Sequence, residues 1–156
     1  MIAWHDRPRL VAHFLNPALM AVVASTSAAE YERARREPMP WVLLFVVAPL
    51  VLHGPSRRAL PPNTRTHLST WVARNPVIRS GFAERARALS PQVKDGVRYG
   101  VRCGALILAG QSIRGRSPSQ ATGQVGELVI AARLVGRWLA KLDRAATAYA
   151  LFGISP

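Results

Sequence analysis

Lysine and arginine side chains recur at helical spacing in one part of the chain. Lys94, Arg98 and Arg102 are four residues apart, an interval that places them on one face of an α-helix. Arg114 and Arg116 follow on a segment typical of a returning β-strand. Ammonium and guanidinium groups gathered in this way can bind phosphates or carboxylates. These five residues are the candidate contact site for nucleic acid or an acidic partner, and the alternative is a solvated helix face.

The types of residue near this stripe limit what it can recognise. Sequence-specific reading of DNA usually combines Arg with Asn, Gln or Ser at base edges, and the stripe carries none of these. Any contact with nucleic acid is therefore expected to be mainly with phosphates and to weaken as salt rises.

No set of side chains predicts catalysis. The histidines share no metal-ligand spacing with acids or with Cys103, and the acids form no pair suited to proton transfer. The serines lie outside any nucleophile elbow, and no glycine-rich phosphate loop is present. We therefore expect a protein that is not an enzyme, with no catalytic residues, no metal site and no cofactor. The four histidines are His5, His13, His53 and His67.

For His53 and Cys103 we expect structural rather than functional roles. His53 follows an apolar segment, where a neutral histidine hydrogen-bonded to the backbone is the expected state. Cys103, the one cysteine of the chain, is expected to be an inert, small core residue. A single cysteine excludes an internal disulfide bond and fits a reducing compartment.

The overall charge favours a negatively charged partner. The chain has 156 residues, a formal net charge of +13 and an isoelectric point near 11.7. The stretch 64–116 holds ten basic residues and two acids, a local net charge of +8. A polyanion or an acidic protein is therefore expected to bind this part of the chain.

The stripe must be positioned by a helix that leads into a hairpin. Ser90 can cap this helix with Pro91 in its first turn, and Gly104 can end it. Residues 105–109 and 112–116 are β-compatible, and the Gly110-Gln111 pair between them suits a two-residue turn. A basic helix followed by a hairpin is the pattern of a winged helix. The apolar positions of this helix are Val93, Val97 and Val101.

The segments that precede the basic helix in the sequence are expected to supply the hydrophobic core. Asn16-Pro17 signals the start of a helix that runs to about Arg36, with a charged and solvated final part over Glu30–Glu37. Residues 40–53 predict a central, enclosed helix, because residues 42–47 lack a polar face, and Pro49 should kink or shorten it. Its apolar run is too short to span a membrane.

Two further helices precede the basic one. The first is capped by Thr64 or Thr66 and carries Trp71, and the second runs from Asn75-Pro76 to about Leu89. The predicted fold class is mainly α, a helical bundle with a winged-helix-like core of three helices and a short β-hairpin, extended by C-terminal helices. We expect one domain over 1–156, with N-terminal helices in 1–62, the winged-helix-like core in 64–116 and C-terminal helices in 124–153.

Several stretches, in this order and at these distances, resemble the middle component of bacterial three-component ABC systems. The resemblance covers almost the whole chain. Its stretches are FLNPAL (Phe14–Leu19), APLVLH (Ala48–His53), the Trp71 helix ending at Arg74–Pro76, LSPQVKDGVRYGVRCGAL (Leu89–Leu106), LVGRWLAK (Leu134–Lys141) and LFGISP (Leu151–Pro156).

The resemblance implies a cytoplasmic, non-catalytic adaptor between an SMC/Rad50-like ABC ATPase and an effector in an anti-phage conflict system. It assigns no binding residues. A subunit of such an assembly should expose apolar surface, for which Trp4 and Leu10–Phe14 are candidates. Two alternatives remain open, a stand-alone winged-helix DNA-binding regulator and a small membrane-associated protein that uses Pro40–His53.

Overall fold

The first described helix, α2 (Pro17–Arg35), begins at the predicted place. The structure, a computed structural model, describes residues 16–155. The Oδ1 of Asn16 accepts a hydrogen bond from the backbone N–H of Ala18 at 2.8 Å, and proline occupies the first helical position. This start therefore follows from the local sequence alone. Trp4 and Leu10–Phe14 lie outside the described residues.

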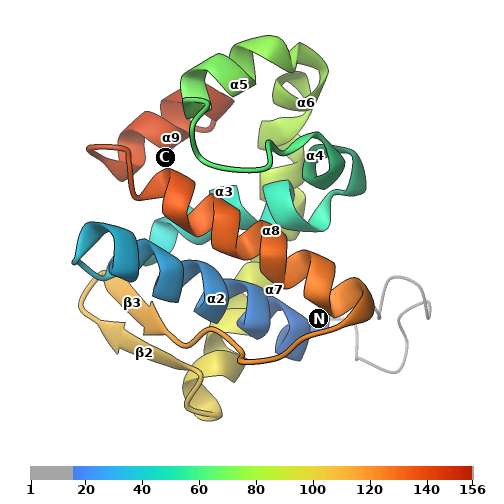
Figure 1. The fold of residues 1–156 in the computed structure, drawn as a ribbon. Coiled ribbons are helices and arrows are strands. Elements are labelled where there is room, and N and C mark those ends of the chain that lie inside the picture. The colour runs from blue at the N-terminus through green and yellow to red at the C-terminus, as the bar shows by residue number, and fades with distance from the viewer. Residues whose placement is uncertain (1–15, 156) are drawn as a thin grey trace.

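The final part of α2 is exposed at Arg33 and Ala34, as predicted, but differs at Glu30. This residue is buried, although the sequence indicates a solvated segment there. Helix α8 (Gly123–Leu139) lies beside α2 (Figure 1) and contacts Glu30. The Nη1 of Arg137 on α8 is 3.5 Å from the Oε2 of Glu30. A carboxylate is tolerated inside the protein because a neighbouring element supplies the opposite charge.

The apolar segment after α2 contains three elements. Strand β1 (Met39–Pro40) comes first, then the 3₁₀ helix η2 (Trp41–Leu43) and helix α3 (Leu44–Leu52). The prediction of an enclosed apolar helix is confirmed for α3, most of whose side chains are buried, and Pro49 lies inside it. The predicted start at Pro40 is wrong, because Met39 and Pro40 pair with another strand.

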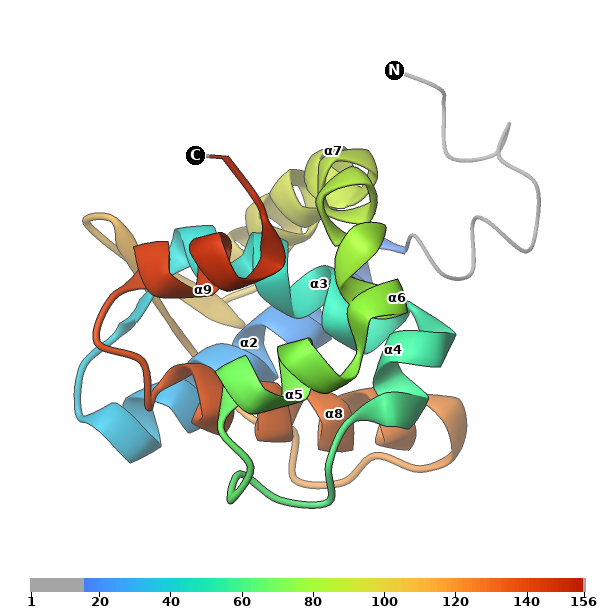
Figure 2. The same ribbon diagram turned by 90° about the horizontal axis from the view of Figure 1, so that it is seen from above.

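Three short helices follow: α4 (Gly54–Ala59), α5 (Leu68–Arg74) and α6 (Pro76–Ser80). Helix α5 begins directly after His67, and no threonine caps it. Helix α6 begins at the predicted proline but ends after one turn, at Ser80. In Figures 1 and 2, α5 and α6 lie together at one end of the molecule.

Helix α7 (Phe82–Arg102) is the longest described element and passes through the predicted boundary at Ser90. Pro91 lies inside it and is exposed. A proline removes one backbone donor and crowds the preceding turn, yet the helix continues because one of its sides stays buried before and after this position. The predicted start at Ser90 is wrong, whereas the predicted end is confirmed by Gly104, whose φ is +79°.

The predicted hairpin is present. Strand β2 (Leu106–Ala109) pairs antiparallel with β3 (Ser112–Gly115), and Ala109 lies opposite Ser112. The turn therefore contains Gly110 and Gln111 only. Gly110 has a φ of +63°, the left-handed conformation that a glycine adopts without strain at the first position of such a turn.

Strand β1 completes a three-stranded antiparallel sheet of order β1-β3-β2, in which Met39 lies opposite Ile113. With the helices, the chain order is α2, β1, α3, α7, β2, β3, in agreement with a winged-helix-like arrangement and a mainly α class. Helices α2 and α3 contact α7. They are therefore the first two helices of the winged-helix-like arrangement, a position that was predicted for the segments of α5 and α6. The segment α4–α6 lies between the second and third of these helices along the chain.

The two C-terminal helices complete the hydrophobic core. Helix α9 (Ala145–Phe152) follows α8 and lies near α5 in Figure 2. The ring of Phe152 stacks on Phe82 of α7 at 4.1 Å, and Trp138 of α8 meets the edge of Trp71 at 5.5 Å. Buried apolar residues of all three predicted parts of the chain thus form one cluster.

Candidate functional site

The exposed side of α7 carries the predicted basic stripe. Lys94, Arg98 and Arg102 are exposed, while Val93 and Gly100 on the same helix are buried. The Nη1 of Arg98 lies 3.1 Å from a carboxylate oxygen of Asp95, one turn earlier on the helix. Three cations therefore share one helix face, and one of them is paired within the helix.

The two hairpin arginines lie on or after β3. The Nε of Arg114 is 3.4 Å from the Oε1 of Glu32 on α2, so this side chain connects the hairpin to α2. Arg116 is exposed just beyond the strand. The structure thus places all five predicted residues at the surface, and Arg114 is engaged with an acidic side chain of the same chain.

The continuity of α7 adds a residue that the sequence analysis missed. Arg87 is exposed and precedes Lys94 by seven residues, which places it on the same side of the helix. The signal was present in the spacing, but the predicted break at Ser90 assigned Arg87 to a different helix. The basic helix face consists of Arg87, Lys94, Arg98 and Arg102, and it also carries Asp95 near its middle.

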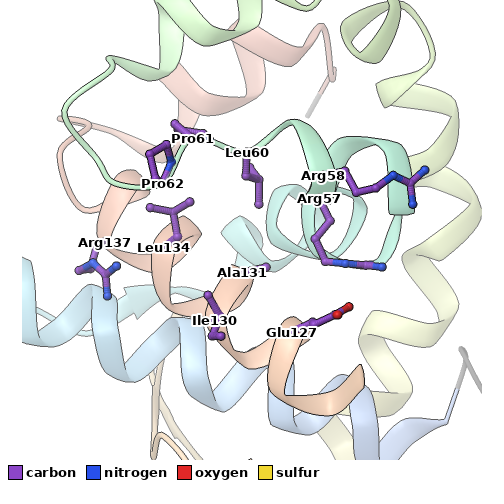
Figure 3. A pocket seen from close by; sticks show the side chains of 10 residues that line it. All are labelled: Arg57, Arg58, Leu60, Pro61, Pro62, Glu127, Ile130, Ala131, Leu134 and Arg137. Atoms are coloured by element: carbon purple, nitrogen blue, oxygen red, sulfur yellow. The ribbon is translucent and has the colours of Figure 1, made fainter. Parts of the chain in front are cut away.

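A second surface feature is a groove of about 460 Å³ between α4, the residues after it and α8. Figure 3 shows Leu60 and Leu134 on opposite walls of the groove. Ile130, at the open side, is 67 % exposed. The arginine-lined groove is defined by Arg57, Arg58, Leu60, Pro61, Pro62, Glu127, Ile130, Ala131, Leu134 and Arg137.

Cations surround the apolar floor of this groove. The Nη1 of Arg57 donates to the carbonyl oxygen of Val51 at 2.8 Å, and Arg137 approaches Glu30. Arg58 is exposed, and its guanidinium points away from α8 in Figure 3. The groove offers an apolar surface whose rim carries three arginines and one acid, Glu127. Sequence patterns could not reveal it, because its walls come from segments about 70 residues apart.

The contact between His53 and Ser56 is the described arrangement that most resembles catalytic chemistry. The Nδ1 of His53 accepts a hydrogen bond from the backbone N–H of Ser56 at 3.3 Å, and the Ser56 hydroxyl lies 2.6 Å from the same nitrogen. Burial and then the charges of Arg85, Arg58 and Arg57 lower the pKa of His53. The expected hydrogen bond between His53 and the backbone is thus present, and the lowered pKa favours the neutral ring. Ser56 is fully buried, so its hydroxyl cannot reach a substrate.

The part of the chain that the structure describes holds no cluster of three His, Cys, Asp or Glu side chains suited to a metal ion. Cys103 is exposed, contrary to the core position predicted for it. The reason is that α7 ends at Arg102, which leaves Cys103 on the turn that leads out of the helix. Between residues 16 and 155, no helix has the length and apolar content that a membrane span requires.

A comparison with known protein families covers these features and the rest of the described structure. The family model of the ABC-three component (ABC-3C) system Middle Component 3 matches residues 4–156. The chain belongs to this family. The match spans every described element of this Middle Component 3 protein. No curated protein and no solved structure matches the chain.

Proposed function

We propose that this Middle Component 3 protein is a non-catalytic adaptor that links an SMC/Rad50-like ABC ATPase to an effector protein. The system would act in bacterial anti-phage conflict, and the protein would work in the cytoplasm. The observation that carries the proposal is the family match over residues 4–156, since the family is a middle component of a three-component system.

The arrangement of surfaces supports an adaptor role. A protein that joins two partners needs two separate contact surfaces. The hairpin and the arginine-lined groove involve different elements. In Figure 1 the hairpin lies at the lower left and α4, which contributes to the groove, at the upper right. Both carry exposed apolar side chains, Ile107 and Leu108 on the hairpin and Ile130 at the groove. Apolar side chains of this kind are typical of surfaces that partners cover.

Pairwise binding tests this proposal. The purified protein would be mixed with the ATPase and, separately, with the effector of its own system, and each mixture resolved by size-exclusion chromatography with mass measurement. We expect a stable complex with each companion. If the protein remains free in both mixtures, the proposed function is contradicted.

DNA binding is the second candidate, because the basic helix face of α7 occupies the position of a recognition helix in a winged-helix-like fold. Such a protein would be a regulator that contacts phosphates without reading bases. Arg102 makes the better test residue, since Arg98 already pairs with Asp95.

Binding of a labelled duplex at several salt concentrations tests this second candidate. Arg102→Ala should weaken binding and reduce the slope of log K against log salt by about one unit. Arg144→Ala, at an exposed position just before α9, provides a charge-matched control that should leave the slope nearly unchanged. Absence of binding by the unaltered protein at low salt would exclude this function.

A further inference from the structure

Ile130 on α8 lies between two hollows of the surface. One is the arginine-lined groove, whose opposite wall runs from α4 to Pro62. The other is a hollow of about 310 Å³ between α8 and the loop 119–122. Ile130 lines both and is 67 % exposed. We call the two hollows together the α8 trough. A single exposed isoleucine is ordinary on a protein surface, whereas one with a hollow on each side can be enclosed by another molecule.

The walls of the α8 trough are held in place by hydrogen bonds. The Nε1 of Trp71 on α5 donates to the carbonyl oxygen of Ala59, at the end of α4, at 2.8 Å. On the other side, Arg133 of α8 donates to the Ser117 hydroxyl at 3.0 Å and to the Pro118 carbonyl oxygen at 2.9 Å, just before the loop. A surface that is already ordered binds a partner without losing further conformational entropy.

The hollowed shape limits what can occupy the trough. Ala131 and Leu134, which line the groove beside Ile130, are buried, so α8 forms a recessed floor and not a ridge. Two copies of this chain related by a twofold axis through this surface would face each other hollow to hollow and leave the space unfilled. The occupant must therefore be a protruding segment of another molecule.

Charge indicates the chemistry of that segment. Figure 3 shows Arg137 and Arg57 on opposite sides of the Ile130 and Leu134 side chains. Arg137 approaches the buried Glu30, yet its side chain remains 43 % exposed. A large apolar side chain flanked by carboxylates complements both the apolar middle and the basic surroundings. The trough is lined by four arginines, Arg57, Arg58, Arg133 and Arg137, and by one acid, Glu127.

Other occupants match this surface less well. A nucleic acid would supply negative charge, but its phosphates would leave the apolar middle without a partner. Residues 1–15 of this chain carry two arginines and one acid, so their charge opposes that of the trough. A second copy bound through a different surface would bring its own net charge of +13.

We infer that the α8 trough binds a protruding segment of an acidic partner protein, which places a large apolar side chain beside Ile130 and carboxylates near Arg57 and Arg137. The inference rests on the proposed adaptor function and names the chemistry of the contact that one of the two companions makes. The apolar contact supplies affinity, and the carboxylates supply selectivity for that companion.

Two substitutions of the same exposed residue test the place and the chemistry of this contact. Ile130→Glu and Ile130→Lys both remove the apolar side chain but add opposite charges. Titration calorimetry with one of the two companions should show that Ile130→Glu weakens binding at least about tenfold and Ile130→Lys at least about threefold less than that. Val77→Glu, on α6, is the charge-matched control and should leave binding unchanged, because Val77 is 81 % exposed and lies outside the trough.

The results separate failure of the inference from failure of the proposed function. If the companions bind and neither responds to Ile130→Glu more than to Val77→Glu, the trough inference is wrong while the adaptor function stands. If neither companion binds the unaltered protein, both fail. Equal weakening by Ile130→Glu and Ile130→Lys would show that the occupant is not acidic, and this would also overturn the inference.

The same variants identify the other occupants, and each of these results overturns the inference. A dimer of the isolated protein that Ile130→Glu dissociates would identify a second copy. A thermal unfolding temperature of the isolated protein that Ile130→Glu lowers and Val77→Glu does not would show that a segment of this chain already covers Ile130. Loss of duplex binding in Ile130→Glu but not in Val77→Glu would identify nucleic acid.

Discussion

Gly136 on α8 packs directly against the backbone of Ser27 on α2. A Cβ added at Gly136 would lie 2.4 Å from the carbonyl oxygen of Ser27 and 3.0 Å from its Cα. The two central helices can approach this closely because one presents no side chain and the other presents a small one. The hairpin and the groove are both built on this pair of helices, through α2 and α8 respectively.

Gly136→Ala should therefore destabilise the protein. Alanine favours a helix over glycine by about 1 kcal/mol, but its methyl group meets rigid backbone and must push α8 away from α2. We expect a net loss of about 1–3 kcal/mol in the free energy of unfolding, measured by urea denaturation. Gly54→Ala is the control, since its methyl group would meet only the flexible end of Arg58 at 3.0 Å. Equal stability of the two variants would contradict the close packing.

A second prediction concerns the contribution of the buried Glu30 side chain to stability. The residue is 5 % exposed, and its carboxylate oxygens lie 3.3 Å from the Nη1 of Arg33 and 3.5 Å from the Nη1 of Arg137. Glu30→Gln removes the charge from both ion pairs, whose Arg33 and Arg137 side chains are 74 % and 43 % exposed, and we expect it to lower the free energy of unfolding by about 0.5–1.5 kcal/mol. Glu37→Gln, whose side chain is 71 % exposed, should change it by less than about 0.5 kcal/mol.

The third prediction concerns pH. Burial lowers the pKa of His53 in the folded protein below its ordinary value of 6.5. Folding therefore favours the neutral ring, and this contribution to stability is present above pH 6.5 and declines as the pH falls below it. His53→Asn keeps a side-chain oxygen that can cap α4 but does not titrate. The difference in stability between the unaltered protein and this variant should shift in favour of the variant between pH 7.5 and pH 5.5.

His67→Asn serves as the control for this experiment, because the His67 side chain caps no amide and is exposed. Its stability should follow that of the unaltered protein across the same pH range. A His53→Asn variant that also follows the unaltered protein would show that His53 does not contribute to the pH dependence.

Local signals predicted some of these elements well. The cap at Asn16 and the turn at Gly110 depend on residues that are adjacent in sequence, and both lie where the sequence indicates. The hairpin could be predicted for the same reason. The exposed positions of Lys94, Arg98 and Arg102 follow from their spacing alone, since a four-residue interval defines a helix face.

Other features depend on partners distant in sequence. Pro91 marks a helix start by local rules, but the buried side of α7 extends past it and the helix continues. Strand β1 is two residues long and exists because Met39 meets Ile113, which is 74 residues away. Glu30 is buried because α8 packs over it. These features and the arginine-lined groove can be recognised only from the tertiary structure.

The proposed adaptor role requires this Middle Component 3 protein to join two other proteins. The direct test is the association of the ABC ATPase with the effector of the same system, measured by co-purification with and without the middle component. We predict that the two proteins associate only when the middle component is present and that all three elute together. Association of ATPase and effector to the same extent without it would contradict the adaptor function.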